Sequence, residues 1–248
     1  MKTRALVLSG YGINADEELA QAFLMAGAEA DRRHVADVVS EPALLAQYDY
    51  IGFPGGFSFG DHLGSGLVLA NLFRQKLEPQ LRSFVADGGL IIGICNGFQT
   101  LVKTGLLPAL DGDDRPVVSL VHNDHGQFID DWVLVDCESE SPCVWTRGLG
   151  RRWLPIRHGE GRFVTDTPET LQRLEAEHLV ALRYAGRNPN GAVASIAGIC
   201  DQSGRVFGLM PHPEAFIHLE CHPARRHGFE GGIGLDLFQQ AVQWKENN

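Results

Sequence analysis

The chain has 248 residues, of which 44% are hydrophobic and 21% charged, a balance that is ordinary for a globular protein. Its 31 acidic residues against 21 Lys and Arg give a net charge of −10, which argues against a primary role in binding nucleic acid. The sequence contains neither an apolar run of about 18 residues nor a charged start followed by an apolar stretch, so we expect no membrane span, no signal peptide and a cytoplasmic location. Five cysteines without C-x-x-C spacing predict reduced thiols.

The first half alternates strand-like and helix-like segments. Asn14 is the expected N-cap of the first helix, and Pro54-Gly55-Gly56 stop the third strand. Such alternation predicts a mainly parallel sheet, with ligands at the C-terminal ends of its strands. The expected strands are residues 4–10, 34–39, 48–56 and 88–94, and the expected helices are 14–28, 66–86 and 96–105.

From about residue 116 the predicted strands become shorter and are joined by polar turns. A helix is expected over residues 167–178, and residues 194–212 are predicted to form a hairpin that turns at 201–204. No repeat and no long linker divides the chain, so residues 1–248 are expected to form one domain. The predicted fold class is therefore α/β: three layers, with a mainly parallel sheet flanked by helices and antiparallel strands added in the second half.

The stretch "LIIGICNGFQTL", residues 90–101, places Cys95 between two glycines where an apolar strand meets a helix. Glycines in a G-x-C-x-G pattern allow a tight strand-to-helix turn that exposes the middle residue. The helix dipole favours a thiolate there, but it contributes only about 0.3–1 kcal/mol, so a nearby base or cation is also needed. The alternative is a buried structural cysteine, which the flanking glycines disfavour. Cys95 is the candidate nucleophile.

A candidate base follows a later apolar strand. In "GLMPHPEAF", His212 can accept the thiol proton, and Glu214 can orient the imidazole and stabilise its charged form. His212 read alone could equally be a surface histidine, so the assignment depends on its meeting Cys95. Cys95, His212 and Glu214 form a candidate triad.

Donors for an oxyanion are expected after the third strand. In "GFPGGFSFGD", Gly55 and Gly56 could direct backbone N–H groups at an oxyanion, together with the N–H of Asn96. An ordinary tight turn is the alternative for this double glycine.

These motifs together resemble a known family. The segments "PGGFSFGD", "GICNGFQTL", "HGEG", "NPNG" and "GLMPHPE", in this order, are similar to those of the class I (triad) glutamine amidotransferases. Within that class the segments "GFPGGFSFGD", "GICNGFQ" and "HGEGRF" resemble those of the glutaminase subunit of phosphoribosylformylglycinamidine synthase. The resemblance extends from about residue 4 to residue 215. The resemblance implies a flavodoxin-like fold.

The resemblance also implies roles for particular residues. Cys95 would be the nucleophile, His212 the general base and acid, and Glu214 the residue that orients it. Gln99 matches a position that contacts the glutamine substrate, and Gln127 and Phe128 are expected near its amino-acid end. The remaining implied residues are those of the oxyanion hole, Gly55, Gly56 and Asn96. His158 and Glu160 belong to the pattern without an assigned chemical role.

The same resemblance implies partners. Ammonia would pass to a large synthetase subunit, with a small bridging subunit as a further possible partner, to form formylglycinamidine ribonucleotide in purine biosynthesis. ATP and Mg would bind that synthetase, because this chain has no G-x-x-x-x-G-K-[ST] loop and no cofactor of its own is expected. Departures from the pattern are Ala215 in place of an arginine, the first loop "SGYGIN", and a long segment 216–234.

Three other interpretations remain. "GYGINA", residues 10–15, fits a dinucleotide-binding loop, although the acidic start of the next helix would repel a pyrophosphate. A metal-binding module is the second, since several zinc-ligand types lie close together, but without a compact zinc spacing. The third is a triad hydrolase or an amidotransferase subunit of another pathway. The residues of the metal hypothesis are His212, His218, Cys221, His222 and His227.

Overall fold

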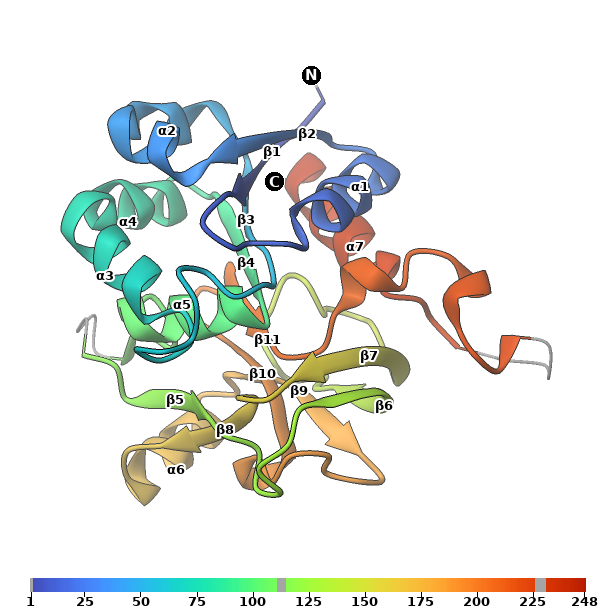
Figure 1. The fold of residues 1–248 in the computed structure, drawn as a ribbon. Helices are drawn as coiled ribbons and strands as arrows, with labels where there is room; N and C mark the ends of the chain where they lie inside the picture. The colour runs from blue at the N-terminus through green and yellow to red at the C-terminus, as the bar shows by residue number, and fades with distance from the viewer. Residues whose placement is uncertain (1, 111–114, 226–230) are drawn as a thin grey trace.

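The computed structural model describes residues 2–110, 115–225 and 231–248. Its centre is a nine-stranded sheet of order β2-β1-β3-β4-β11-β10-β9-β6-β7 (Figure 1). Strands β2 to β11 in this order are parallel to one another, and the remaining pairs are antiparallel. The strands are β1 (Arg4–Ser9), β2 (Glu29–His34), β3 (Tyr50–Phe53), β4 (Leu90–Ile94), β6 (Ile129–Cys137), β7 (Arg152–His158), β9 (Val180–Ala185), β10 (Ile196–Cys200) and β11 (Val206–Leu209).

Helices cover both faces of the parallel half of the sheet: α1 and α7 lie on one side and α3, α4 and α5 on the other (Figure 1). A separate antiparallel ribbon joins β5 (Val118–Val121) to β8 (Arg162–Thr165). The helices are α1 (Asp16–Ala26), α2 (Val35–Ser40), α3 (Leu67–Lys76), α4 (Glu78–Ala86), α5 (Asn96–Thr104), α6 (Pro168–Ala176) and α7 (Leu235–Glu246). Short 3-10 turns are η1 (Pro42–Gln47), η3 (Val193–Ser195), η4 (Pro213–Ala215) and η5 (Leu219–Cys221).

This arrangement confirms the predicted α/β class with added antiparallel strands. The core beneath α1 and α7 is a cluster of aromatic rings contributed by Phe23, Tyr50, Trp145 and Phe238. All five cysteines are free thiols. None of the helices in the described part of the chain has the length and apolar character needed to cross a bilayer.

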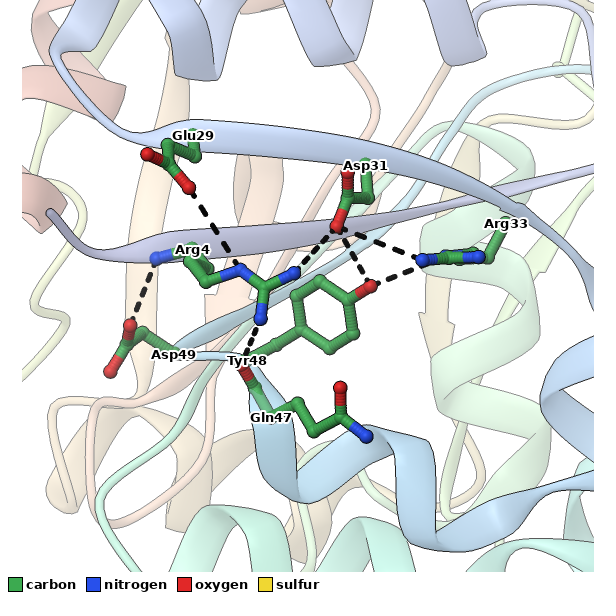
Figure 2. Close-up of polar contacts among 7 residues, drawn as sticks. All are labelled: Arg4, Glu29, Asp31, Arg33, Gln47, Tyr48 and Asp49. Atoms are coloured by element: carbon green, nitrogen blue, oxygen red, sulfur yellow. Dashed lines mark hydrogen bonds and ion pairs between the residues drawn. The ribbon is translucent and has the colours of Figure 1, made fainter.

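The second strand was predicted wrongly. Residues 35–40 form helix α2, and the strand is the preceding segment, β2, at the edge of the sheet. Its sequence, EADRRH, shows no apolar alternation because most of the strand is exposed. Polar contacts hold it instead: Arg4 on β1 forms an ion pair with Asp31 at 2.9 Å, and the Tyr48 hydroxyl donates a hydrogen bond to the same carboxylate (Figure 2). Charged side chains are a common protection of edge strands.

Two helix boundaries also differ from the prediction. Asn14 is not a cap, because the N-cap position of α1 is Ala15 and no side chain bonds the helix start. The expected helix over residues 66–86 is two helices, α3 and α4, which meet at Leu77. Pro79 lies in the first turn of α4, where its missing N–H costs no hydrogen bond, so the chain starts a second helix there. Strand β9 and helix α7 had no counterpart among the predicted elements.

The register between β4 and β11 brings two distant segments to the same edge. Ile94 lies opposite Leu209 in this parallel pair, and the N–H of Cys95 donates to the carbonyl of Leu209 at 2.8 Å. Both strands therefore end together, with Cys95 following one and His212 following the other.

Candidate active site

Cys95 occupies a strained turn between β4 and α5. Its backbone has φ 52° and ψ −104°, a conformation that costs a residue with a Cβ free energy and that tends to persist at functional sites. The glycines on either side serve close packing: a Cβ at Gly97 would collide with the carbonyl oxygen of Phe53, and one at Gly93 would lie 2.8 Å from the carbonyl of Gly97. The predicted tight strand-to-helix turn, here called the elbow, is therefore present, and the residue in the strained conformation is Cys95 itself.

His212 and Glu214 lie beside Cys95. The Nδ1 atom of His212 is 2.6 Å from Oε1 of Glu214, and both side chains are buried. The main chain of His212 is fixed by its N–H, which donates to the carbonyl of Pro155 at 2.8 Å. With Nδ1 bonded to the carboxylate, Nε2 is the atom left to exchange a proton, and it has no well-aligned hydrogen-bond partner among the described residues. Cys95 and His212 line one cavity, and Glu214 is joined to it through its bond to His212.

The charges around His212 favour its protonated form. Burial lowers the pKa of His212, but the carboxylate of Glu214 and the nearby Cys95 thiol outweigh burial and raise this pKa to about 9. The Sγ atom of Cys95 donates a hydrogen bond to the carbonyl oxygen of Arg157 at 3.8 Å. The protonated imidazole of His212 can therefore act as a general acid that donates a proton to a leaving nitrogen.

The expected oxyanion donors belong to the segments that follow β3 and β4. Gly56 lines the cavity with Cys95, and Asn96 follows the nucleophile as the first residue of α5. The N–H groups of Gly55, Gly56 and Asn96 donate no hydrogen bond to a described residue. Gly55 lies against the imidazole, since a Cβ there would come within 2.8 Å of Cε1 of His212. The loop keeps its shape because the carbonyl of Gly55 accepts from Asn14 and Ala15.

The cavity has a volume of about 110 Å³ and a wall of mixed polarity. Gln99 lines it, accepts a hydrogen bond from Nδ2 of Asn96 and donates to the carbonyl of Glu160 at 2.7 Å. Phe128 also lines it, whereas Gln127 is exposed and lies outside the lining. The lining residues are Asn14, Gly56, Phe57, Asp61, Ser65, Cys95, Gln99, Phe128, Arg157, His158, Gly159, Glu160 and His212.

Sequence reasoning missed the part played by residues 157–160. The carbonyls of Arg157 and Glu160 receive hydrogen bonds from Cys95 and Gln99, and the Arg157 guanidinium lies 3.9 Å from Glu214. The motif "HGEG" was the available signal, but the partners that give it meaning lie about 60 residues away in the sequence. This segment forms one wall of the cavity.

The two rival site hypotheses find little support. In the loop of residues 10–15, the N–H groups of Asn14 and Ala15 already donate to Gly55, so they are not free to bind a pyrophosphate. Among the described residues no three His, Cys, Asp or Glu side chains come together as metal ligands, and His227 of the metal hypothesis lies outside those residues. His222 packs instead against the rings of Trp132 and Phe216.

Comparison with known proteins identifies the family. The family profile described as "CobB/CobQ-like glutamine amidotransferase domain" matches residues 2–245. The chain belongs to this glutamine amidotransferase family. Among curated members, the phosphoribosylformylglycinamidine synthase subunit PurQ of Dehalococcoides mccartyi is 42% identical, with 98% of each chain covered. The PurQ subunit of Methanococcus maripaludis is also 42% identical, with 97% of each chain covered.

Solved structures agree with this assignment. This chain matches a chain in the structure of PurLQS from Thermotoga maritima with a TM-score of 0.76 and 31% identity. The match covers 99% of this chain and 100% of that chain. A second glutamine amidotransferase from the same organism matches with a TM-score of 0.53 at 15% identity, covering 100% of this chain and 93% of that one, which shows the shared fold alone.

Proposed function

We propose that this chain hydrolyses glutamine to glutamate and ammonia through a thioester on Cys95, as the glutaminase subunit of phosphoribosylformylglycinamidine synthase. The observation that carries the residue assignment is that Cys95, in a strained turn, and His212 line one cavity, with Glu214 bonded to His212 at 2.6 Å. The relatives named above support the reaction and the pathway, which is purine biosynthesis.

The mechanism follows from the geometry. The proton of Cys95 moves to Nε2 of His212, where the Glu214 carboxylate stabilises the charged ring, and the sulfur attacks the side-chain amide carbon of glutamine. The oxyanion accepts hydrogen bonds from the N–H groups of Gly56 and Asn96, with Gly55 shaping the loop, and each such donor is worth roughly 2.7–4 kcal/mol in the transition state. His212 protonates the departing nitrogen, ammonia leaves, and water hydrolyses the thioester to release glutamate.

Ammonia released by this reaction has a use only if a second enzyme takes it as a substrate. The structural relative is part of the PurLQS complex, which supports a large synthetase subunit as the partner and a small bridging subunit as a further one. We place the ATP and Mg of the synthase reaction on that partner and expect no cofactor in this chain. The cytoplasmic location and the single domain over residues 1–248 stay predictions.

A glutaminase assay tests this function. The chain alone should release glutamate slowly from glutamine, and addition of the synthetase subunit with its nucleotide substrate should raise the rate. Co-elution of the two chains should accompany that rise. Glutaminase that the synthetase neither binds nor stimulates would contradict the partnership but not the triad, whereas the absence of any glutamate release by the complex would contradict both.

A further inference from the structure

His158 lies in the wall of the active-site cavity and has no part in the mechanism above. The side chain is 3% exposed and comes from the end of β7, between the carbonyl that receives Cys95 and the one that receives Gln99. Its Nε2 atom is buried and has no hydrogen-bond partner among the residues that the structure describes. Buried polar atoms are nearly always paired, so an unpaired one on a residue that lines a cavity points to a ligand.

The protonation of the His158 ring is fixed by Asn123. The Nδ2 group of Asn123 donates to the carbonyls of Gln127 and His158, both at 2.9 Å, which leaves Oδ1 as an acceptor. Oδ1 accepts from the N–H of Gly161 at 3.1 Å and lies 3.0 Å from Nδ1 of His158. Nδ1 must therefore carry the proton in the neutral ring, so Nε2 has a lone pair and no hydrogen.

The ring also stays neutral at physiological pH. Burial, followed by the proximity of His212, lowers the pKa of His158 to about 4. Two histidines at the same cavity thus have opposite characters, since the pKa of His212 is raised to about 9. His212 can supply a proton from Nε2, whereas Nε2 of His158 can only accept a hydrogen bond.

We infer that Nε2 of His158 accepts a hydrogen bond from the NH2 group of the bound glutamine side chain and so selects the amide over the carboxylate of glutamate. This inference rests on the proposed function. An amide nitrogen offers two donors, whereas an ionised carboxylate offers only acceptors. Glutamate would place oxygen lone pairs against the lone pair of Nε2, and unpaired buried polar groups discriminate strongly between substrates. Because glutamate cannot make this hydrogen bond, the product is held less tightly than the substrate and leaves after hydrolysis.

Two substitutions separate this role from a structural one. His158→Asn keeps an N–H donor that can reach Asn123 but removes the acceptor at Nε2. His158→Gln places a carbonyl oxygen near the position of Nε2 but gives up the donor to Asn123. The measured quantity is the ratio of the inhibition constant of glutamate to the KM of glutamine, determined in the complex with the synthetase subunit, with folding checked by thermal melting.

The parent complex should prefer glutamine, His158→Asn should lower the ratio by about tenfold, and His158→Gln should keep most of it. An unchanged ratio in His158→Asn, or an equal loss in both variants, would overturn the inference while the proposed function stands. If His158→Asn does not fold, His158→Gln decides alone: a retained ratio supports the acceptor and a collapsed ratio overturns it. A parent complex without Cys95-dependent glutaminase would overturn the proposed function and the inference together.

Discussion

The two halves of the sheet contribute differently to the site. The parallel half, β2 to β11 in spatial order, ends in the turns that hold Cys95, the oxyanion loop and His212. The antiparallel half contributes the wall of residues 157–160 at the end of β7, and Phe128 just before β6. On the proposed mechanism the reacting groups follow the parallel strands, while the added strands shape the cavity that would hold the substrate. Substitutions in the parallel half should therefore lower kcat, and those in the antiparallel half should act on KM.

The largest effect is expected at the nucleophile. Cys95→Ala removes the sulfur and should lower glutamine hydrolysis by about 10⁴-fold or more, as loss of a nucleophile does in other triad enzymes. The fold should remain, because alanine fits the space that cysteine fills. Glutamate release and circular dichroism check the two expectations. Residual activity within about tenfold of the parent would exclude Cys95 as the nucleophile.

The next effect is expected at the carboxylate that orients the base. Glu214→Gln should lower kcat by at least about a hundredfold, because the imidazole loses both its orientation and its stabilising charge. The substitution should also lower the pKa of His212, since the Glu214 charge raises it. A pH profile of kcat unchanged from that of the parent would contradict the His212–Glu214 coupling.

The same pair sets a dependence of stability on pH. The folded-state pKa of His212 lies at about 9, above its ordinary value of 6.5. Its contribution to the free energy of unfolding is therefore complete below about pH 6.5 and is lost as the pH rises through about 9. Urea unfolding across this range should show the loss in the parent and a smaller one in Glu214→Gln. Equal slopes in both proteins would argue against this origin.

A stability effect should distinguish the packed elbow from an ordinary loop. Gly97→Ala places a Cβ against the carbonyl of Phe53 and should lower the free energy of unfolding by about 3 kcal/mol. Gly150→Ala is the matched control, because nothing lies within 4 Å of a Cβ there. Its unfolding free energy should change by less than about 0.5 kcal/mol. Similar melting temperatures for the two variants would show that the elbow can relax.

The smallest effect is expected in the antiparallel half. Phe128→Ala removes a ring that lines the cavity and should raise the KM of glutamine several-fold with little change in kcat. Gln127→Ala is the comparison, because Gln127 is exposed and lies outside the cavity lining. A larger rise in KM for Gln127→Ala than for Phe128→Ala would support the expectation that Gln127 contacts the substrate. A fall in kcat for Phe128→Ala would break the division between the two halves.

The sequence predicted the parallel half better than the rest. Strands β1, β3 and β4 are short apolar runs that end close to a glycine or at Cys95, so their own residues mark them as buried strands although their pairing partners are distant. Strand β2 was misplaced because an exposed edge needs no apolar face. The role proposed for His158 could not be predicted, since it depends on Asn123, 35 residues away, which only the folded chain brings into contact. The triad needed the β4–β11 register, which no local pattern encodes.

The central claim is that Cys95 is the nucleophile of a glutamine site, and chemical trapping tests it most directly. The complex is treated with a glutamine-like electrophile, and the modified residue is located by mass spectrometry, with and without excess glutamine. The account predicts one adduct, on Cys95, that glutamine prevents. Labelling of other cysteines to the same extent, or labelling of Cys95 that glutamine does not block and that any simple alkylating agent reproduces, would contradict it.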